Sequence, residues 1–468
     1  MKLKPLLHYL QTPVDAASLV YFRIVFAAIM LWEVWRYWSN DWIARFYILP
    51  DFHFKYYGFE WVEPWPGSGM YWHFVVMAIL ATCMLVGFMY RLAALLFFFA
   101  FTYIFLLDQT KYLNHFYLVC LIALVMPFLP ANRYLSIDAW LRPKLRSATV
   151  PRWAPLALIA LTEVMLIYAG VVKINHDWLH LQPLTMWLGA RHFLPVIGPY
   201  MGETWLVAIA SYYSITLHIL GAPLMLWRKT RFWVFWFYVT FHLSNVVLFN
   251  IGIFPWLTIA TTLMFFDPDW PRQFWRWLGS PDMSLPKPSP PLNLPPEPMT
   301  PATAATLLFL GVFLLFNVLY PLRHYLYPGD VAWTEEGHRF AWRMKLRSKH
   351  GVAQFTVRDP DTGREWEVNE REFLTSRQAG KMAKRPDMTL QFAHFIDREW
   401  QRRHNIRDPE VYVRCFLSLN GRDLQLYIDP ERDLSKVKRE LWPPADWILP
   451  MTNPLPPVVK TGVHQHRN

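Results

Sequence analysis

Residues 90–129 read YRLAALLFFFAFTYIFLLDQTKYLNHFYLVCLIALVMPFL. The segment contains two apolar runs, 91–107 and 113–130, separated by a short stretch that holds Asp108 and Lys111. An apolar run of about 17 to 25 residues has the length of a helix that crosses a hydrocarbon core about 30 Å thick. The segment therefore predicts two neighbouring membrane-spanning helices.

The composition of the whole chain agrees with this prediction. Of its 468 residues 54% are hydrophobic, 17% are aromatic and only 17% are charged, which is too apolar for an ordinary soluble protein. We expect a polytopic α-helical membrane protein with about nine transmembrane helices. The predicted spans lie near 18–38, 70–88, 91–107, 113–130, 154–174, 204–227, 232–249, 252–266 and 303–321.

The distribution of Lys and Arg predicts the orientation. Cytoplasmic loops of membrane proteins carry an excess of these residues, and the excess falls on the N-terminal side of the first span and on every second loop thereafter. The N-terminus is therefore expected in the cytoplasm, and an odd number of spans places the C-terminal region in a periplasm, cell exterior or lumen. The same bias accounts for much of the net charge of +11, so we expect no nucleic-acid partner.

The chain divides into four predicted regions. Residues 1–277 form the transmembrane helical bundle, and 278–302 form a proline-rich cytoplasmic linker that cannot be regular helix. Residues 303–324 form the last transmembrane helix, and 325–468 form an exported soluble domain. In that domain two stretches with two-residue alternation are interrupted by DTG and NGR, as in hairpins, and flank a helix-like stretch. The pattern predicts a small α+β or β-sandwich-like domain.

Ionisable and amide side chains interrupt the apolar spans at one depth. Asn114 and His115 open the fourth span, Lys173 closes the fifth, and His242 and Asn245 lie in the outer half of the seventh. Residues three positions apart share one helix face, so His242 and Asn245 point the same way. Because ionisable groups inside a membrane are costly, they indicate a working site. A polar cluster among aromatics suits a flat apolar ligand with a few oxygens.

Each of these residues also has a structural interpretation. A lysine at a span end often extends its ammonium to the interface, and histidines often form hydrogen bonds between helices. Glu163, in the middle of the fifth span, is interpreted as a paired structural carboxylate. An ammonium held in an apolar pocket has a lowered pKa, so Lys173 could act as a base. From the residues alone the site could equally be a proton relay in a transporter.

Several longer motifs resemble the vitamin K-dependent γ-glutamyl carboxylases, within the wider class of horizontally transferred transmembrane domain proteins. The similarity continues past the last span with TEEGHRFAWRM, VRDPDTG, FLTSRQ and VYVRCFLSLNGR. The motifs within the spans are FLLDQTKYLNHFYL (105–118), AGVVKINHDW (169–178), FHLSNVVLFNIGIF (241–254) and FFDPDWPRQF (265–274).

The resemblance implies a reaction. Lys173 occupies the position of the family's catalytic base, which deprotonates vitamin K hydroquinone (reduced phylloquinone or menaquinone) so that it reacts with O2. The oxygenated vitamin then removes a γ-proton from a glutamyl residue, CO2 adds to the carbanion, and the vitamin leaves as its epoxide. The expected cofactor is therefore vitamin K hydroquinone, with O2 and CO2 as co-substrates, and the expected partners are a glutamate-containing exported peptide or protein and membrane lipid.

The resemblance also assigns roles to the polar and apolar residues around the quinone. His115 and His242 are expected to act with Lys173 in catalysis, since they match family positions that contact or polarise the quinone oxygens. Asn114 matches the same family pair as His115, and Ile251 and Phe254 match residues that line the naphthoquinone. The predicted cofactor-binding residues are therefore Asn114, Ile251 and Phe254, together with Asn245 from the polar cluster.

Two other functions are compatible with the sequence. The first is a vitamin K epoxidase without carboxylation, and the second is a non-catalytic carrier of quinones or lipids in which Lys173 and the histidines only neutralise a polar head group. No metal is expected in any of the three, because the three cysteines are widely separated and form no CxxC pair.

Overall fold

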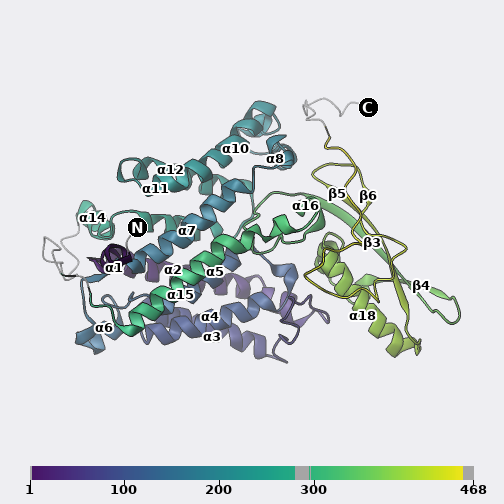
Figure 1. Ribbon diagram of the computed structural model, residues 1–468, viewed down its shortest axis with the longest axis horizontal. Helices are drawn as coiled ribbons and strands as arrows, with labels where there is room; N and C mark the ends of the chain where they lie inside the picture. Colours follow the sequence, from purple (N-terminus) through teal and green to yellow (C-terminus); the bar gives the residue numbers. More distant parts are fainter. Residues whose placement is uncertain (1–2, 280–294, 296, 457–468) are drawn as a thin grey trace.

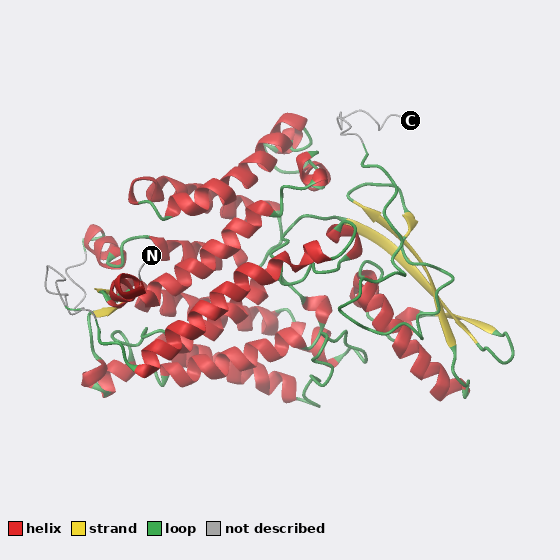
Figure 2. Ribbon diagram, in the orientation of Figure 1, coloured by secondary structure: helices red, strands yellow, loops and turns green. Residues whose placement is uncertain are grey.

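The computed structural model describes residues 3–279, 295 and 297–456. Figure 1 shows helices packed side by side in a helical body, residues 3–326, and a small sheet with one long helix at one end of that body. We call residues 331–456 the outer domain. Figure 2 shows that the long strands are confined to this domain. The chain is thus mostly helical, with a small C-terminal domain that contains a sheet, as predicted.

Five helical segments of the described chain are long and apolar enough to cross a membrane. They are α2 (Ala17–Ser39), α3 (Gly69–Val86), α7 (Trp153–Val171), the composite of α10 (Thr204–Thr216), η6 (Leu217–Gly221) and α11 (Ala222–Met225), and α15 (Pro301–Leu319) with η8 (Tyr320–Leu326). Three shorter apolar segments are α4 (Tyr90–Leu106), α5 (Asn114–Val125) with η3 (Met126–Phe128), and α13 (Phe254–Thr262) with η7 (Leu263–Phe265).

Each of the nine predicted spans falls on one of these segments or on α12 (Arg228–Leu248). Helix α12 has an apolar body but begins with Arg228, Lys229 and Arg231. Its first turn is therefore more polar than the predicted span, which began at 232. The helices themselves are confirmed, whereas the number that crosses the membrane stays a prediction.

Buried ion pairs and hydrogen bonds close the end of the body opposite the outer domain. A two-stranded antiparallel ladder joins β1 (Pro13–Asp15) to β2 (Thr149–Pro151), and Asp15 accepts from the Arg272 guanidinium at 2.8 Å. Arg23 of α2 is buried and donates to the Ala131 carbonyl at 2.8 Å. The other elements near this end are α1 (Leu3–Gln11), α6 (Ile137–Leu141), η4 (Pro143–Leu145) and α14 (Trp270–Trp277).

The outer domain has an α+β fold. Its sheet has the antiparallel order β4-β3-β5-β6, and alternate residues of β5, from Val411 to Leu419, are buried. Because a single sheet is covered by helices, the α+β form of the prediction is confirmed and the sandwich-like form is wrong. The elements are α16 (Val331–Thr334), β3 (Lys349–Arg358), β4 (Glu365–Val368), η9 (Glu370–Glu372), α17 (Ser376–Met382), α18 (Pro386–His404), β5 (Glu410–Leu419) and β6 (Gln425–Leu426).

Most of the predicted proline-rich linker, 278–302, lies outside the described residues. The described segments that connect the helices near the outer domain contain η1 (Ala44–Ile48), η2 (Gln109–Lys111), α8 (His176–Leu179), α9 (Leu184–Gly189) and η5 (Gly198–Tyr200).

These connecting segments contact the outer domain. The Gln378 side chain donates to the Phe52 carbonyl at 2.6 Å, and Arg439 pairs with Glu60 at 2.8 Å. The outer domain is therefore fixed against one end of the body, where the polar residues singled out above also lie.

Candidate active site

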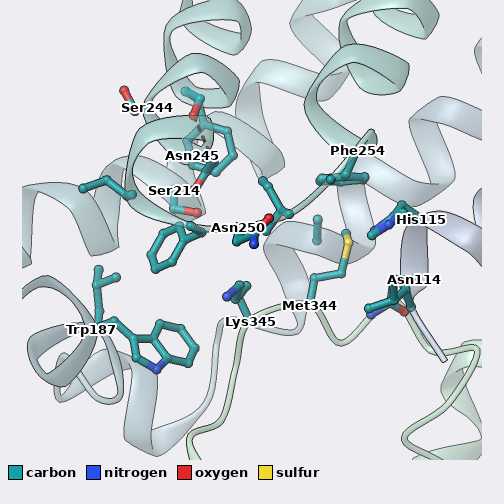
Figure 3. Close-up of a pocket in the computed structure, with 18 of the residues that line it drawn as sticks. Asn114, His115, Trp187, Ser214, Ser244, Asn245, Asn250, Phe254, Met344 and Lys345 are labelled. Carbon is teal, nitrogen blue, oxygen red and sulfur yellow. Dashed lines mark hydrogen bonds between the residues drawn. The ribbon is translucent and has the colours of Figure 1, made fainter. Parts of the chain in front are cut away.

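A cavity of about 630 Å³ lies between the helical body and the outer domain. Its walls come from α2, α5, α7, α10, η6, α12 and α13, and from the segments that contain η1, η2, α8 and α9. Met344, Lys345 and Arg377 of the outer domain complete it. Figure 3 shows side chains of both regions directed into this space. A volume in this range accommodates a small organic ligand.

Lys173 lies in the turn that follows α7, beyond the last residue of that candidate span. Its amide donates to the Gly170 carbonyl at 3.0 Å, and its side chain turns back so that Nζ donates to the Ala169 carbonyl. Nζ lies 5.6 Å from the ring centroid of Trp178. Among the described residues no carboxylate forms an ion pair with it, and burial lowers the pKa of Lys173 to about 7. Lys173 therefore supplies an amine that can be neutral at physiological pH.

Asn114 and His115 begin α5 and line the cavity (Figure 3). The Tyr112 hydroxyl donates to Asn114 Oδ1 at 3.0 Å and thereby orients the amide. The His115 ring lies 6.0 Å from the ring of Phe254, centroid to centroid. No described residue forms a hydrogen bond with the His115 ring nitrogens, so they are available to a ligand.

The seventh predicted span places only part of its polar pair on the cavity. Asn245 lines it and donates to the Phe241 carbonyl at 2.9 Å, and Ile251 lines it from the loop before α13. His242 is not a lining residue. It is buried behind Phe254, with ring centroids 5.8 Å apart, and neither ring nitrogen has a hydrogen-bond partner among the described residues. The other six predicted site residues lie on one cavity, and His242 packs against its wall.

A histidine that the sequence analysis did not select also lines the cavity. His218, in the π-helical turn η6, donates from Nδ1 to the Ser214 carbonyl at 2.7 Å. It packs against α7 at Gly170, where an added Cβ would lie 2.9 Å from the His218 Cβ. An ionisable residue in an apolar span was the available signal. Glu163 does not line the cavity, and its interpretation as a paired carboxylate is wrong, since neither oxygen has a partner among the described residues.

Cations make up most of the charge on the cavity wall. Among the described residues that line the cavity, the one carboxylate is Glu33, which is already paired with Arg36 at 2.5 Å. Lys111, Lys345 and Arg377 have no ion-pair partner in the described part of the chain.

Each of these three side chains makes a cation–π contact with an aromatic ring. Lys111 and Arg377 lie 3.1 and 5.0 Å from the ring centroid of Phe46, and Lys345 lies 4.6 Å from that of Phe249. Burial and the neighbouring Arg377 lower the pKa of Lys111 to about 7. An anionic ligand would relieve this repulsion.

The arrangement combines an apolar space, a buried amine and a cationic wall. It suits a mainly apolar ligand with a few polar atoms together with an anionic group. Within the described ranges, no group of three or more His, Cys, Asp or Glu side chains is placed to hold a metal ion.

Two protein-family models match the chain. The HTTM domain model matches residues 11–270, more than half of the chain, and the model of the vitamin K-dependent gamma-carboxylase lumenal domain matches residues 302–454. The first match covers most of the helical body and the second covers the last predicted span and the outer domain. No solved structure matches the chain.

Proposed function

Because the chain belongs to the HTTM-domain family and carries the lumenal domain of the vitamin K-dependent gamma-carboxylases, we propose that it oxygenates vitamin K hydroquinone and carboxylates glutamyl residues with CO2. The two family matches confirm the predicted resemblance and support a membrane enzyme with a lumenal domain. The observation that carries the finer proposal is the buried Lys173 amine in a cavity formed by both matched regions.

The lining residues fit a reduced naphthoquinone. Aromatic and aliphatic side chains, among them Phe116, Trp178 and Phe254, supply apolar walls, and a few polar groups interrupt them, as is usual for a binding site of this kind. The His115 ring nitrogens and the Lys173 amine are the groups that could meet the quinol oxygens. When bound, the reduced vitamin would react with O2 and supply the strong base that the glutamyl γ-proton requires.

The protein's own contribution begins with a proton. Lys173 Nζ, neutral in part at pH 7, accepts a proton from a ligand hydroxyl. His115 and Asn114 orient the ligand from α5, Ile251 and Phe254 pack against its apolar part, and Asn245 adds a polar amide from α12. His242 supports the position of Phe254 from behind. Burial by the outer domain excludes water, which would otherwise quench a strong base.

The cationic wall favours carboxylation over epoxidation alone. A glutamyl side chain brings a carboxylate to the site, and Lys111, Lys345 and Arg377 are cations on the cavity wall without carboxylate partners in the described chain. Charge-assisted hydrogen bonds to these cations would hold such a group. A carrier of neutral quinones would gain nothing from placing these three cations on the cavity wall.

The proposal is tested with the purified protein in detergent, reduced vitamin K and O2. We expect epoxide in amounts well above a Lys173→Ala control, and incorporation of labelled bicarbonate when a glutamyl peptide is added. Epoxide without incorporated label would support the epoxidase without carboxylation. If the wild-type protein forms no more epoxide than the control, both enzymatic functions are wrong and the carrier is favoured.

A further inference from the structure

A buried ion pair joins the outer domain to the segment that follows Lys173. Asp177 of α8 accepts from Arg422 at two points, Oδ2 from Nη1 at 2.6 Å and Oδ1 from Nη2 at 2.7 Å. Asn420 donates to the same carboxylate at 2.7 Å. All three side chains are buried. A bidentate pair of this kind fixes orientation as well as distance.

The turn after β5 is shaped to present these donors. Asn420 and Gly421 both have positive φ, 54° and 84°, as a two-residue type I′ turn requires. Asn420 also exchanges two hydrogen bonds of 2.8 Å with Ser348. The tip packs so closely that a Cβ on Gly421 would lie 3.4 Å from the sulfur of Met186 in α9.

Arg422 has little freedom apart from Asp177. Its Nε donates to the Asn453 carbonyl at 3.1 Å, and Nη1 also donates to the Leu419 carbonyl at 3.2 Å. These bonds within the outer domain fix the guanidinium independently of Asp177. The ion pair therefore couples the position of Asp177 to the position of the outer domain.

The carboxylate is connected to Lys173 by a short, hydrogen-bonded stretch of chain. Asn175 caps α8 by accepting from the Trp178 amide at 3.0 Å and donates back to the Val172 carbonyl at 2.9 Å. Trp178 follows Asp177 in α8, and its ring centroid lies 5.6 Å from Lys173 Nζ. A displacement of Asp177 would therefore move the aromatic wall beside the amine.

We propose that Arg422 and Asn420 are positioning residues for Lys173, which they hold through Asp177 and α8 so that the amine is correctly placed only when the outer domain is docked. This inference rests on the proposed function, in which Lys173 is the base. It makes the outer domain a part of the oxygenation site as well as of the substrate site.

The test compares two ion pairs that join the same two regions. Asp177→Asn keeps the shape of the side chain but removes its charge, and Arg422→Lys keeps the charge but cannot form the bidentate contact. The control is Glu60→Gln with Arg439→Lys, because Glu60 and Arg439 form a more exposed pair of 2.8 Å that also joins the two regions, lies outside the cavity and does not involve α8.

We call the ion pair between Asp177 and Arg422 the latch. Both latch variants, Asp177→Asn and Arg422→Lys, should lower kcat for epoxide formation by about tenfold or more, with a smaller change in KM for the hydroquinone. The control variants should stay within about twofold of the wild type. Asp177→Glu, which retains the carboxylate, should recover part of kcat. Equal losses in the latch and control pairs would show a general docking effect and overturn the inference.

A second measurement needs no enzymatic activity. The rate at which acetic anhydride acylates Lys173, followed by mass spectrometry across pH, reports the midpoint of its titration. In the latch variants we expect this midpoint to rise by about one pH unit or more as water reaches the amine, with no shift in the control pair. An unshifted midpoint in folded Asp177→Asn protein contradicts the inference. If the wild type forms no epoxide but the midpoint still rises in the latch variants, only the proposed function is refuted.

Discussion

The Lys173 side chain lies in a protein environment that favours its neutral form. Burial lowers its pKa to about 7, and a base functions only when it is unprotonated. We therefore predict that kcat for epoxide formation rises with pH through about 7 and levels off about one to two units higher. Lys173→Arg should be inactive at every pH, since a guanidinium stays protonated. A wild-type rate that falls over the same pH range would exclude the amine as the base.

The cationic wall leads to a prediction about substrate discrimination. Arg377→Gln and Lys111→Gln should raise KM for a glutamyl peptide by about tenfold, equivalent to ~1.4 kcal/mol of binding, and raise KM for the hydroquinone much less. Arg364→Gln, at an exposed outer-domain arginine that does not line the cavity, is the control. Peptide and hydroquinone KM values that change in parallel would argue that these cations only stabilise the cavity.

The sequence identifies those site residues whose placement in a membrane is energetically costly, because this cost can be recognised without knowing the fold. Lys173, Asn114 and His115 interrupt or end apolar spans, where a polar group is rare. Lys345 and Arg377 lie in the outer domain outside any apolar span, where a cation is ordinary, and only the docking of that domain brings them to the cavity. Sequence spacing placed His242 on the same helix face as Asn245, but it could not show which side chain the neighbouring Phe254 would cover.

At the level of helices, the contact between α7 and η6 depends on one small residue. An added Cβ at Gly170 would lie 2.7 Å from Ile219 Cγ1 and 3.1 Å from the Ile219 backbone nitrogen. The Ile219 backbone cannot move without displacing η6. We therefore predict that Gly170→Ala separates the two elements, destabilises the protein by about 1–3 kcal/mol and lowers kcat.

The control for this prediction is Gly311→Ala in α15, where an added Cβ meets nothing within 4 Å. Thermal unfolding in detergent measures stability, and epoxide formation measures kcat. If Gly170→Ala retains the stability and kcat of the control, the close approach of η6 to α7 is not required for the site.

The long helices were predictable because a span length and an apolar composition are local properties. The short elements were not. The ladder between β1 and β2 pairs residues more than a hundred positions apart, and α8 is defined largely by its Asn175 cap and its contact with the outer domain. The NGR turn was predicted from its residues, but its role as the partner of Asp177 depends on tertiary structure.

At the scale of the whole molecule, one cavity is formed jointly by the helical body and the outer domain. Each region supplies most of one hydrophobic cluster, but Trp342 of the outer domain packs in the cluster of the body and Phe54 of the body packs in that of the outer domain. Met344, Lys345 and Arg377 of the outer domain also close the cavity that Lys173 lines. The domain division near residue 325 stays a prediction, and the candidate site draws residues from both sides of it. An isolated helical body would have an open, wetter cavity around its lysine.

The function proposed for this shared cavity depends on the orientation of the protein in the membrane, because a glutamyl substrate must reach the side that carries the outer domain. We predict that an impermeant maleimide labels Thr362→Cys, at the exposed turn between β3 and β4, in intact cells or spheroplasts. Lys144→Cys in η4, at the opposite end of the body, should be labelled only after permeabilisation. The native Cys415 is no substitute, since it is buried and donates to the Ala383 carbonyl. The reverse labelling pattern would place the outer domain in the cytoplasm, where exported peptides could not meet the cationic wall.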